Sequence, residues 1–393
     1  MIAPDSITGP LSGISVIDFT RLIAGPCASD ILASLGATVM KVESPEGDAM
    51  RNTKSKDVGD QPTAPTFAAY NVLKSSVTLD LKNPAHRARA LDLCASADVV
   101  MHAFRPGVMD RLGLGAHDLR ARNPALVVAG LSAFGATGSQ KSRGGVDIVL
   151  QAESGLMSVT GEPDGAPMKV GVPIIDAASG YVLALGIVAS LLGRQRGIAG
   201  TEDLDVSMLD VGVHLQAQSF AEFLASGVPP ARVGNAAPYA APAEVYDAAD
   251  GRFVLSAHLP AHWSVLCTAL GHPELPDDPR FRTVADRVRN REELNSILQQ
   301  SFSSQTVEHW LDELGRHGLT AGKVRSYSEV VDGAGATDNA SIVDATNVDG
   351  SALKVVRPPL RFNGWDDRTL RRQVPPLAPV SDPTETLSTG TTL

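Results

Sequence analysis

The chain has 393 residues, of which 43% are hydrophobic and 20% are charged, a composition typical of a soluble globular protein with two domains. Its formal net charge of −10 argues against a nucleic-acid or anionic-membrane surface, although a local basic cluster can still bind an anionic small ligand. Three dispersed cysteines without a CxxC pair indicate a reducing compartment and argue against disulfides or a thiolate metal site. Because the first residues also lack a secretory pattern, we expect a cytoplasmic protein.

In the first half of the chain, apolar runs typical of buried strands alternate with helical segments. The expected strands are 14–19, 37–43, 76–80, 98–102 and 126–131, and the expected helices are 25–35, 84–96 and 108–112. This alternation predicts an α/β fold with a parallel sheet covered on both faces. The longest apolar run, Tyr181 to Leu192, is too short to span a bilayer and predicts a core helix.

The pattern changes after Gly227, where Val228 and two prolines mark a linker. Residues 240–330 combine short strands with helices, which predicts a smaller α+β domain. Its expected strands are 243–246 and 253–256, and its expected helices are 261–270, 290–301 and 306–317. One more strand is expected within 351–362, followed by an extended, Pro/Thr/Ser-rich tail from Val374.

Asp176 is the most informative position, because the sequence predicts that a β-rich stretch from Met168 runs into a small-residue helix there. A carboxylate at such a junction faces the unpaired N–H groups and the positive dipole end of the helix. One interpretation is a helix N-cap, a common role of aspartate. The other is a nucleophile, because an aspartate is ionised at neutral pH and needs no neighbouring base.

Several other kinds of site are disfavoured by their missing motifs. The turn from Thr20 to Pro26 contains no GxGxxG, so an NAD site is disfavoured even though Glu43 ends the second strand, and no P-loop motif occurs. His258 and His262 have metal-ligand spacing, but Pro260 lies between them and no HExxH glutamate is present. No GxSxG occurs, and Cys27 is interpreted as a packed thiol.

Basic residues in loops form a more suggestive set. Several of them follow the carboxyl ends of expected strands, where open α/β sheets bind ligands. Single members are interpreted as solvated surface charges, but together they suit a polyphosphate ligand. The set comprises Arg21, Arg51, Lys74, Arg105, Arg111, Lys141 and Arg143.

Ordered motifs over nearly the whole chain resemble the class III CoA-transferases, the CaiB/BaiF or formyl-CoA transferase family, which includes α-methylacyl-CoA racemase. No single segment is decisive, but their order and spacing together are specific. The matching segments are 10–19, 24–26, 35–43, 47–51, 79–82, 104–107, 110–113, 123–124, 134–138, 144–147, 205–210, 234–235, 250–251, 278–281, 290–291 and 358–359.

The resemblance implies that Asp176 is the family's nucleophilic aspartate. It implies transfer of CoA from an acyl-CoA donor to a free carboxylic acid, through an aspartyl mixed anhydride and then a β-aspartyl-CoA thioester. Acyl-CoA and carboxylic acids are then the substrates, and no metal or tightly bound cofactor is needed. Backbone N–H groups at the start of the helix are expected to stabilise developing charge.

The resemblance also implies a Rossmann-like large domain built from both chain ends, a smaller α+β domain, and an interlocked homodimer. The expected boundaries are 1–215 for the first part of the large domain, 216–335 for the linker and small domain, and 336–393 for the return segment. The CoA-binding residues carried over by position are Arg21, Ile23, Ala24, Lys74, Phe104 and Arg111, to which the basic loops add Arg143.

Three departures from the family pattern bear on specificity. Val146 stands where racemases of the family have a histidine and formyl-CoA transferases a tyrosine, and Ala103 replaces the usual asparagine before Phe104. The segment 234–242 lacks a glycine run, so the expected acceptor is a short dicarboxylate or branched acid, with Tyr239 a candidate pocket residue. A racemase or epimerase and a CoA-binding protein without turnover remain the alternatives, and neither the donor nor the pathway is specified.

Overall fold

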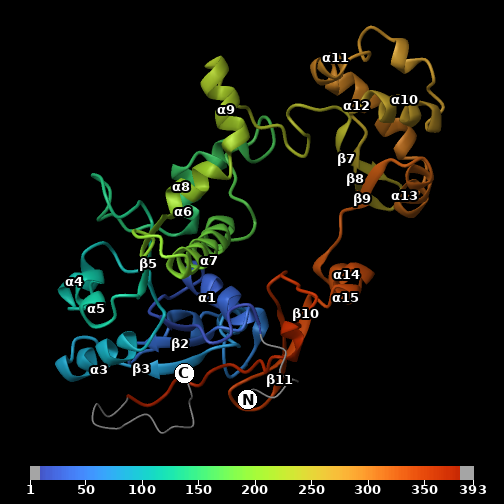
Figure 1. Ribbon diagram of the computed structural model, residues 1–393. Coiled ribbons are helices and arrows are strands. Elements are labelled where there is room, and N and C mark those ends of the chain that lie inside the picture. Colours follow the sequence, from blue (N-terminus) through green and yellow to red (C-terminus); the bar gives the residue numbers. More distant parts are fainter. Residues whose placement is uncertain (1–8, 381–393) are drawn as a thin grey trace. The chain divides into compact units, whose positions relative to one another are not determined.

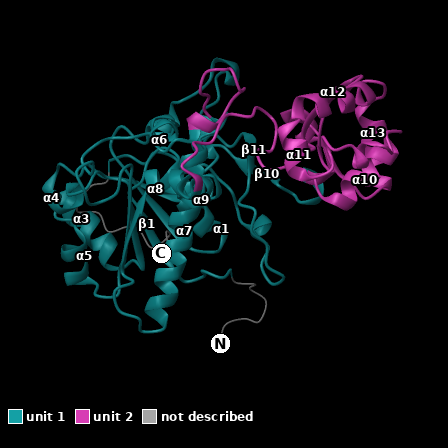
Figure 2. Ribbon diagram, turned by 90° about the horizontal axis from the view of Figure 1, so that it is seen from above, with its two compact units in different colours: residues 1–156, 170–225, 336–393 teal, residues 157–169, 226–335 magenta. Residues whose placement is uncertain are grey.

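The computed structural model describes residues 9–380, which form two compact units (Figures 1 and 2). Within this range, unit 1 comprises residues 9–156, 170–225 and 336–380, and unit 2 comprises 157–169 and 226–335. The segment 157–169 therefore groups with unit 2 rather than with the large domain in which the sequence placed it. Residues 217–226, assigned to the linker and small domain from the sequence, form a helix that lies almost entirely in unit 1.

Unit 1 contains a six-stranded parallel sheet in the order β3-β2-β1-β4-β5-β6. Its strands are β1 (Ser15–Asp18), β2 (Thr38–Glu43), β3 (Ser75–Thr78), β4 (Val99–His102), β5 (Val127–Ser132) and β6 (Asp203–Ser207). Its helices include α1 (Ala24–Ser34), α2 (Pro65–Ala68), α3 (Pro84–Ala95), α4 (Val108–Arg111), α5 (Ala116–Arg122), α6 (Asp147–Glu153), α7 (Ile174–Gln195), α8 (Met208–His214) and α9 (Ala217–Ser226). The strands β1 to β5 confirm the sequence expectation, whereas β6 was not predicted.

Both faces of the sheet are covered because successive strand residues point to opposite sides. In β1, Val16 packs with α1 and α7 in one core cluster, whereas Ile17 packs with α3 and α5 in another. The strands β4 and β5 alternate in the same way, and Val99 and Val100 belong to opposite clusters. Because helices cover both faces of the parallel sheet, a ligand-binding site is expected at the carboxyl ends of the strands.

The helix α7 packs along α1 in the core of unit 1. Their contact is close at Gly180, where an added Cβ would lie 2.7 Å from the Cβ of Cys27. Among residues 9–380, α7 alone is long and apolar enough to cross a membrane, but Leu183 and Ile187 are fully buried in the core cluster. This confirms the expected core helix. The opposite face of α7 exposes apolar side chains, with Leu185 70% exposed.

Unit 2 has its own core around an antiparallel sheet in the order β7-β8-β9. Its elements are β7 (Ala243–Ala248), β8 (Gly251–Ser256), α10 (Pro260–Ala269), α11 (Val284–Arg289), α12 (Arg291–Phe302), α13 (Val307–Arg316), β9 (Thr320–Lys323) and α14 (Tyr327–Val331). After α15 (Ala334–Asp338), the chain returns to unit 1 as an antiparallel hairpin of β10 (Ile342–Thr346) and β11 (Ala352–Val356). The expected tail is described as far as Val380, and 381–393 lie outside the described residues.

Candidate active site

A cavity of about 360 Å³ lies at the carboxyl edge of the unit 1 sheet. The strands β1 and β4 are neighbours there, and the strand order reverses between them, with β2 and β3 on one side and β5 and β6 on the other. Open α/β folds usually bind their ligands in the crevice at such a reversal. The loops after β1, β4 and β5 form most of the wall. The lining residues are Phe19, Arg21, Leu22, Ile23, Ala24, Gly25, Ala49, Ala103, Phe104, Leu131, Ser132, Ala133, Gly145, Val146, Asp176 and Met208.

The loop between β1 and α1 has a tightly specified backbone. A Cβ at Gly25 would lie 2.2 Å from the Cβ of Thr20, so only glycine allows this close approach. Leu22 has a φ of +67°, a left-handed conformation that is uncommon for leucine, and its N–H donates to Asp48 Oδ1 over 3.4 Å. Such strain persists only where the surroundings enforce it, and here it presents Leu22 to the cavity.

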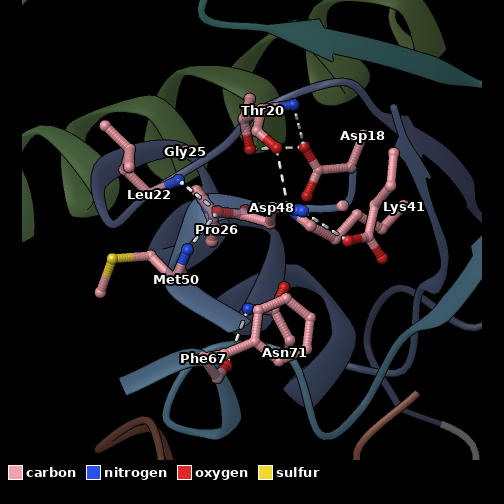
Figure 3. A network of polar contacts seen from close by, with 12 residues as sticks. Asp18, Thr20, Leu22, Gly25, Pro26, Lys41, Asp48, Met50, Phe67 and Asn71 are labelled. Carbon is pink, nitrogen blue, oxygen red and sulfur yellow. Dashed lines mark hydrogen bonds and ion pairs between the residues drawn. The ribbon is translucent and has the colours of Figure 1, made fainter. Parts of the chain in front are cut away.

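A buried polar network holds this loop from below (Figure 3). Asp18 is completely buried and accepts hydrogen bonds from Thr20 N–H (2.7 Å), Thr20 Oγ1 (2.5 Å) and Ser29 Oγ (2.5 Å). Burial raises the pKa of Asp18, but the charges of Lys74 and Lys41 and these hydrogen bonds outweigh it and hold the pKa below its usual value.

Lys41 connects this network to the next loop. Its Nζ donates to the Thr20 carbonyl over 2.8 Å and forms an ion pair with Asp48 Oδ2 over 2.9 Å, and both side chains are fully buried. Asp48 also accepts the N–H of Met50 over 3.0 Å. The cavity wall near Leu22 is therefore fixed by charge pairs that do not themselves line the cavity.

Asp176 lies in the first turn of α7, whose first helical residue is Ile174 and whose N-cap is Pro173. The N-cap interpretation of Asp176 is therefore wrong. The β-strand expected before it is also wrong, because residues 168–173 form no strand. The position next to β5 is instead taken by β6.

Asp147 supplies the cap that Asp176 does not. Its Oδ1 accepts the N–H groups of Ile175 (2.8 Å) and Asp176 (3.2 Å), and its Oδ2 accepts Nε2 of Gln151 (2.6 Å). The expectation that the first N–H groups of α7 are free to stabilise developing charge is therefore corrected, because Asp147 occupies two of them. The sequence signal nearest to the helix start is Pro173, which lies immediately before the first helical residue.

The position of Asp176 also changes its acidity. Burial and, to a smaller extent, the neighbouring Asp147 charge together raise its pKa to about 6. At neutral pH the carboxylate remains mostly ionised, yet it is more basic than an exposed aspartate. A more basic carboxylate is a better nucleophile and proton acceptor, which suits acyl transfer.

The other predicted site residues divide into two groups. Arg21, Ile23, Ala24 and Phe104 line the cavity beside Asp176. Arg21 and Phe104 also border a second cavity, of about 390 Å³, that continues over the ends of β2 and β3. Lys82 lines this second cavity, although sequence analysis did not assign it a binding role.

Three of the predicted CoA-binding residues, all of them basic, line neither of these two cavities. Lys74 is buried, and its Nζ forms an ion pair with Asp18 over 3.5 Å and donates to the Pro26 carbonyl over 3.0 Å. Arg111 ends α4, and Arg143 forms an ion pair with Glu153 over 2.5 Å. Lys74 thus supports the β1–α1 loop from within, which sequence position alone did not reveal.

The cavity wall next to Asp176 is largely apolar. Val146 lines it and is 50% exposed, and Ala103 and Met208 lie on the same wall. Val146 has no ionisable group with which to exchange a proton with a substrate. Among residues 9–380, no cluster of three or more His, Cys, Asp or Glu side chains is placed to hold a metal ion.

Comparisons with known proteins identify the family. The sequence matches the model of CoA-transferase family III over residues 11–378. It is 37% identical over 380 residues to the probable fatty acyl-CoA transferase Rv3272 of Mycobacterium tuberculosis, covering 94% of this chain and 95% of the relative. It is 36% identical over 378 residues to the acetyl-CoA:oxalate CoA-transferase of Acetobacter aceti, covering 95% and 94%.

Solved structures show the same fold. The orthorhombic crystal structure of Rv3272 superposes with a TM-score of 0.84 at 37% identity, covering 95% of this chain and 98% of that one. A CaiB/BaiF family protein from Brucella suis gives a TM-score of 0.81 at 32% identity, covering 94% and 97%. Because the family model matches most of this chain, the chain belongs to CoA-transferase family III and is a CoA-transferase.

Proposed function

We propose that the protein moves CoA from an acyl-CoA donor to a free carboxylic acid, with Asp176 as the covalent nucleophile. The observation that carries the proposal is the position of Asp176. Its carboxylate lines a cavity at the carboxyl edge of the sheet, and burial and Asp147 raise its pKa to about 6. It is therefore anionic at neutral pH and intrinsically more reactive than an exposed aspartate.

The proposed reaction begins with attack of an Asp176 oxygen on the donor thioester carbonyl. The C–S bond breaks, which leaves a mixed anhydride and the CoA thiolate. The thiolate then attacks the aspartyl carbonyl, releases the donor carboxylate and forms a β-aspartyl-CoA thioester. The first step exchanges an acyl–sulfur bond for an acyl–oxygen bond, and the second step does the reverse. No oxidant, metal or external base is therefore required.

The second half of the reaction repeats these steps with the acceptor. The acceptor carboxylate attacks the β-aspartyl-CoA thioester, expels the CoA thiolate and forms a second mixed anhydride. The thiolate attacks the acceptor acyl carbon, which gives the new acyl-CoA and regenerates the Asp176 carboxylate. Water must stay out of this cavity, because hydrolysis of either anhydride would waste the thioester.

Donors for the developing negative charge are available at α1. The N–H groups of Ala24 and Gly25 are the first two of that helix and have no partner among the described residues, and both residues line the cavity. A helix N-terminus combines free N–H groups with a favourable dipole. We assign to them the stabilisation that was first expected of α7.

CoA is proposed to lie along the two cavities that share Arg21 and Phe104. The Arg21 side chain is exposed between them and can pair with a phosphate, while the Phe104 ring offers a stacking surface. Arg111 and Arg143 are exposed and remain proposed contacts of the CoA phosphates. Lys74 is proposed to act indirectly, by positioning the β1–α1 loop.

Short dicarboxylic acids are the proposed acceptors. Relatives named as acetyl-CoA:oxalate and succinate–glutarate CoA-transferases, which are 36% and 35% identical, support this class. Another relative is named as a probable fatty acyl-CoA transferase, so long-chain acids are the acceptors to compare with the short dicarboxylic acids. A substrate panel with both classes therefore decides between them.

An interlocked homodimer is also proposed. Its support is the unpaired apolar surface of unit 1, where Leu185 and Leu192 of α7 and Leu224 of α9 are 70%, 51% and 79% exposed. Contiguous exposed apolar side chains mark association surfaces in soluble proteins. Light scattering after gel filtration should give twice the chain mass, and a monomer at micromolar concentration would contradict the proposal.

Intact-mass spectrometry tests the mechanism. The protein is mixed with acetyl-, succinyl- and long-chain acyl-CoA and quenched with acid, and a parallel sample is treated with hydroxylamine, which should convert an aspartyl anhydride or thioester to a hydroxamate. An acyl-sized or CoA-sized adduct should map to Asp176 and disappear in Asp176→Asn. Asp210→Asn is the matched control, because Asp210 is also the third residue of its helix but is exposed and lines no described cavity beside Asp176. Adducts that persist in Asp176→Asn would reject it as the nucleophile.

A further inference from the structure

A third cavity of unit 1, of about 380 Å³, lies between α1 and the β10–β11 hairpin, and we name it the α1–hairpin cavity. From α1 it is lined by Cys27, Asp30 and Ile31, whose spacing places them on one helix face. The site beside Asp176 is instead lined by the start of α1, at Ala24 and Gly25. The same helix therefore borders two separate cavities.

Asp30 is the unusual member of this wall. It is only 5% exposed, and its carboxylate forms no hydrogen bond with any residue of the described range. Burial raises its pKa to about 6 even though Lys74 and Arg372 act in the opposite direction. A buried carboxylate without a hydrogen-bond partner is unfavourable, so native structures almost always provide one.

The nearby cations are already engaged elsewhere. Lys74 Nζ donates to Asn71 Oδ1 and to the Pro26 carbonyl, each over 3.0 Å. Arg372 forms an ion pair with Asp367 over 2.6 Å. They lower the electrostatic penalty of the Asp30 charge without satisfying its oxygen atoms. The remaining space beside Asp30 is the cavity itself.

The rest of the wall suits an apolar body with a positive head. Tyr70 and Tyr181 contribute aromatic rings, and Ile31 and Val355 contribute aliphatic surface. Aromatic rings attract organic cations through their faces. The two basic residues of the wall are engaged by other acids, because Lys354 pairs with Asp344 over 2.8 Å and Arg357 pairs over 2.7 Å with Asp367, whose carboxylate it shares with Arg372.

We propose that the α1–hairpin cavity binds a small organic cation, an ammonium group on an apolar stem, with Asp30 as its counter-ion. The proposal does not depend on CoA transfer, because none of its wall residues borders the cavity beside Asp176. The hydrogen-bonded ion pair would satisfy the Asp30 oxygens, and the two phenyl rings of the tyrosines would cover the stem.

Calorimetric titration of the full chain with benzylammonium at neutral pH tests the proposal, with benzyl alcohol as the uncharged probe of similar shape. We expect benzylammonium to bind at least about tenfold more tightly, because only it can form the charged hydrogen bond. Equal affinities for the two probes, or no binding of benzylammonium at millimolar concentration to folded protein, would overturn the proposal.

Variants locate the site. Asp30→Asn should weaken benzylammonium binding at least about tenfold, whereas Asp60→Asn, which removes an exposed carboxylate that does not line this cavity, should not. Tyr181→Ala changes a half-exposed residue of the cavity wall and gives a second test that leaves the core intact. If Asp30→Asn instead dissociates an oligomer and leaves benzylammonium binding unchanged, a basic side chain of a second copy occupies the cavity and the proposal is wrong.

Discussion

Two groups of carboxylates lie close to the start of α1 and have opposite electrostatics. Asp18 and Asp48 are fully buried, yet each is paired with a lysine, and hydrogen bonds help to hold the pKa of Asp18 below its usual value. Asp176 and Asp30 have no such partner, and burial raises the pKa of each to about 6. Burial alone therefore does not determine acidity. The paired acids fix the backbone of the site, and the unpaired ones are left available for chemistry or binding.

The largest expected effect separates the roles of the two groups. Asp176→Asn should lower the turnover of CoA transfer by at least about 10³-fold, because it removes the proposed nucleophile. It should not lower the free energy of unfolding, since the charge that it removes is disfavoured by burial. Transfer rates by mass spectrometry and urea denaturation measure both quantities. Retained turnover, or a large loss of stability, would place Asp176 among the structural acids.

The converse change breaks the paired group. Lys74→Met should lower the free energy of unfolding by about 3–5 kcal/mol, because it leaves Asp18 buried without this partner. Lys141→Met is the control, and because Lys141 is exposed its effect should stay within about 0.5 kcal/mol. Urea denaturation of both variants makes the comparison. Similar stabilities would mean that Lys41 alone suffices for Asp18.

Asp30→Asn should have a smaller effect of opposite sign. Because the pKa of Asp30 is raised from 3.8 to about 6, its contribution to stability is fully present below 3.8 and is lost as the pH rises to about 6. At neutral pH the variant should therefore gain up to about 3 kcal/mol of unfolding free energy. Near pH 3.8 the gain should vanish. A loss of stability at neutral pH would show that an unseen hydrogen-bond donor serves Asp30.

The smallest expected effect is a shift in pH dependence. CoA transfer should fall as the pH drops through about 6, because protonated Asp176 cannot attack a thioester. Burial is the larger cause of this raised pKa, but Asp147→Asn removes the smaller one, the neighbouring charge, so the acid limb should move to lower pH. Glu153→Gln, on the same helix but exposed, should leave the limb in place. An unchanged limb in Asp147→Asn would assign the raised pKa to burial alone.

Much of unit 1 could be predicted from local sequence because its central strands are continuously apolar. Val16 and Ile17, or Val99 and Val100, must each be buried on opposite faces, and this requirement is visible in the sequence. The strand β6 has the sequence Asp203-Leu-Asp-Val-Ser207 and gives no such signal. It forms a strand because β5 offers an unpaired edge, which is a tertiary property.

The sequence predicted site residues only where their position next to a strand end places them at the cavity. Arg21, Ile23 and Ala24 follow β1 directly, so the strand end places them at the cavity. The contact between Asp147 and the first turn of α7 joins residues 29 positions apart, and no local pattern reveals it. The burial of Lys74 likewise depends on Asp18, which lies 56 positions earlier in the chain.

The discontinuity of unit 1 has a consequence for synthesis on the ribosome. The edge strand β3 is covered by the end of the described chain, where Thr78 Oγ1 donates to the Ala378 carbonyl over 2.7 Å and Thr78 pairs with Val380. Arg51 Nη1 similarly donates to the Pro375 carbonyl over 2.9 Å. Unit 2 can be completed while these residues are still untranslated. The nascent chain therefore carries an open sheet edge until late in translation, which is when chaperones would protect it from pairing with other chains.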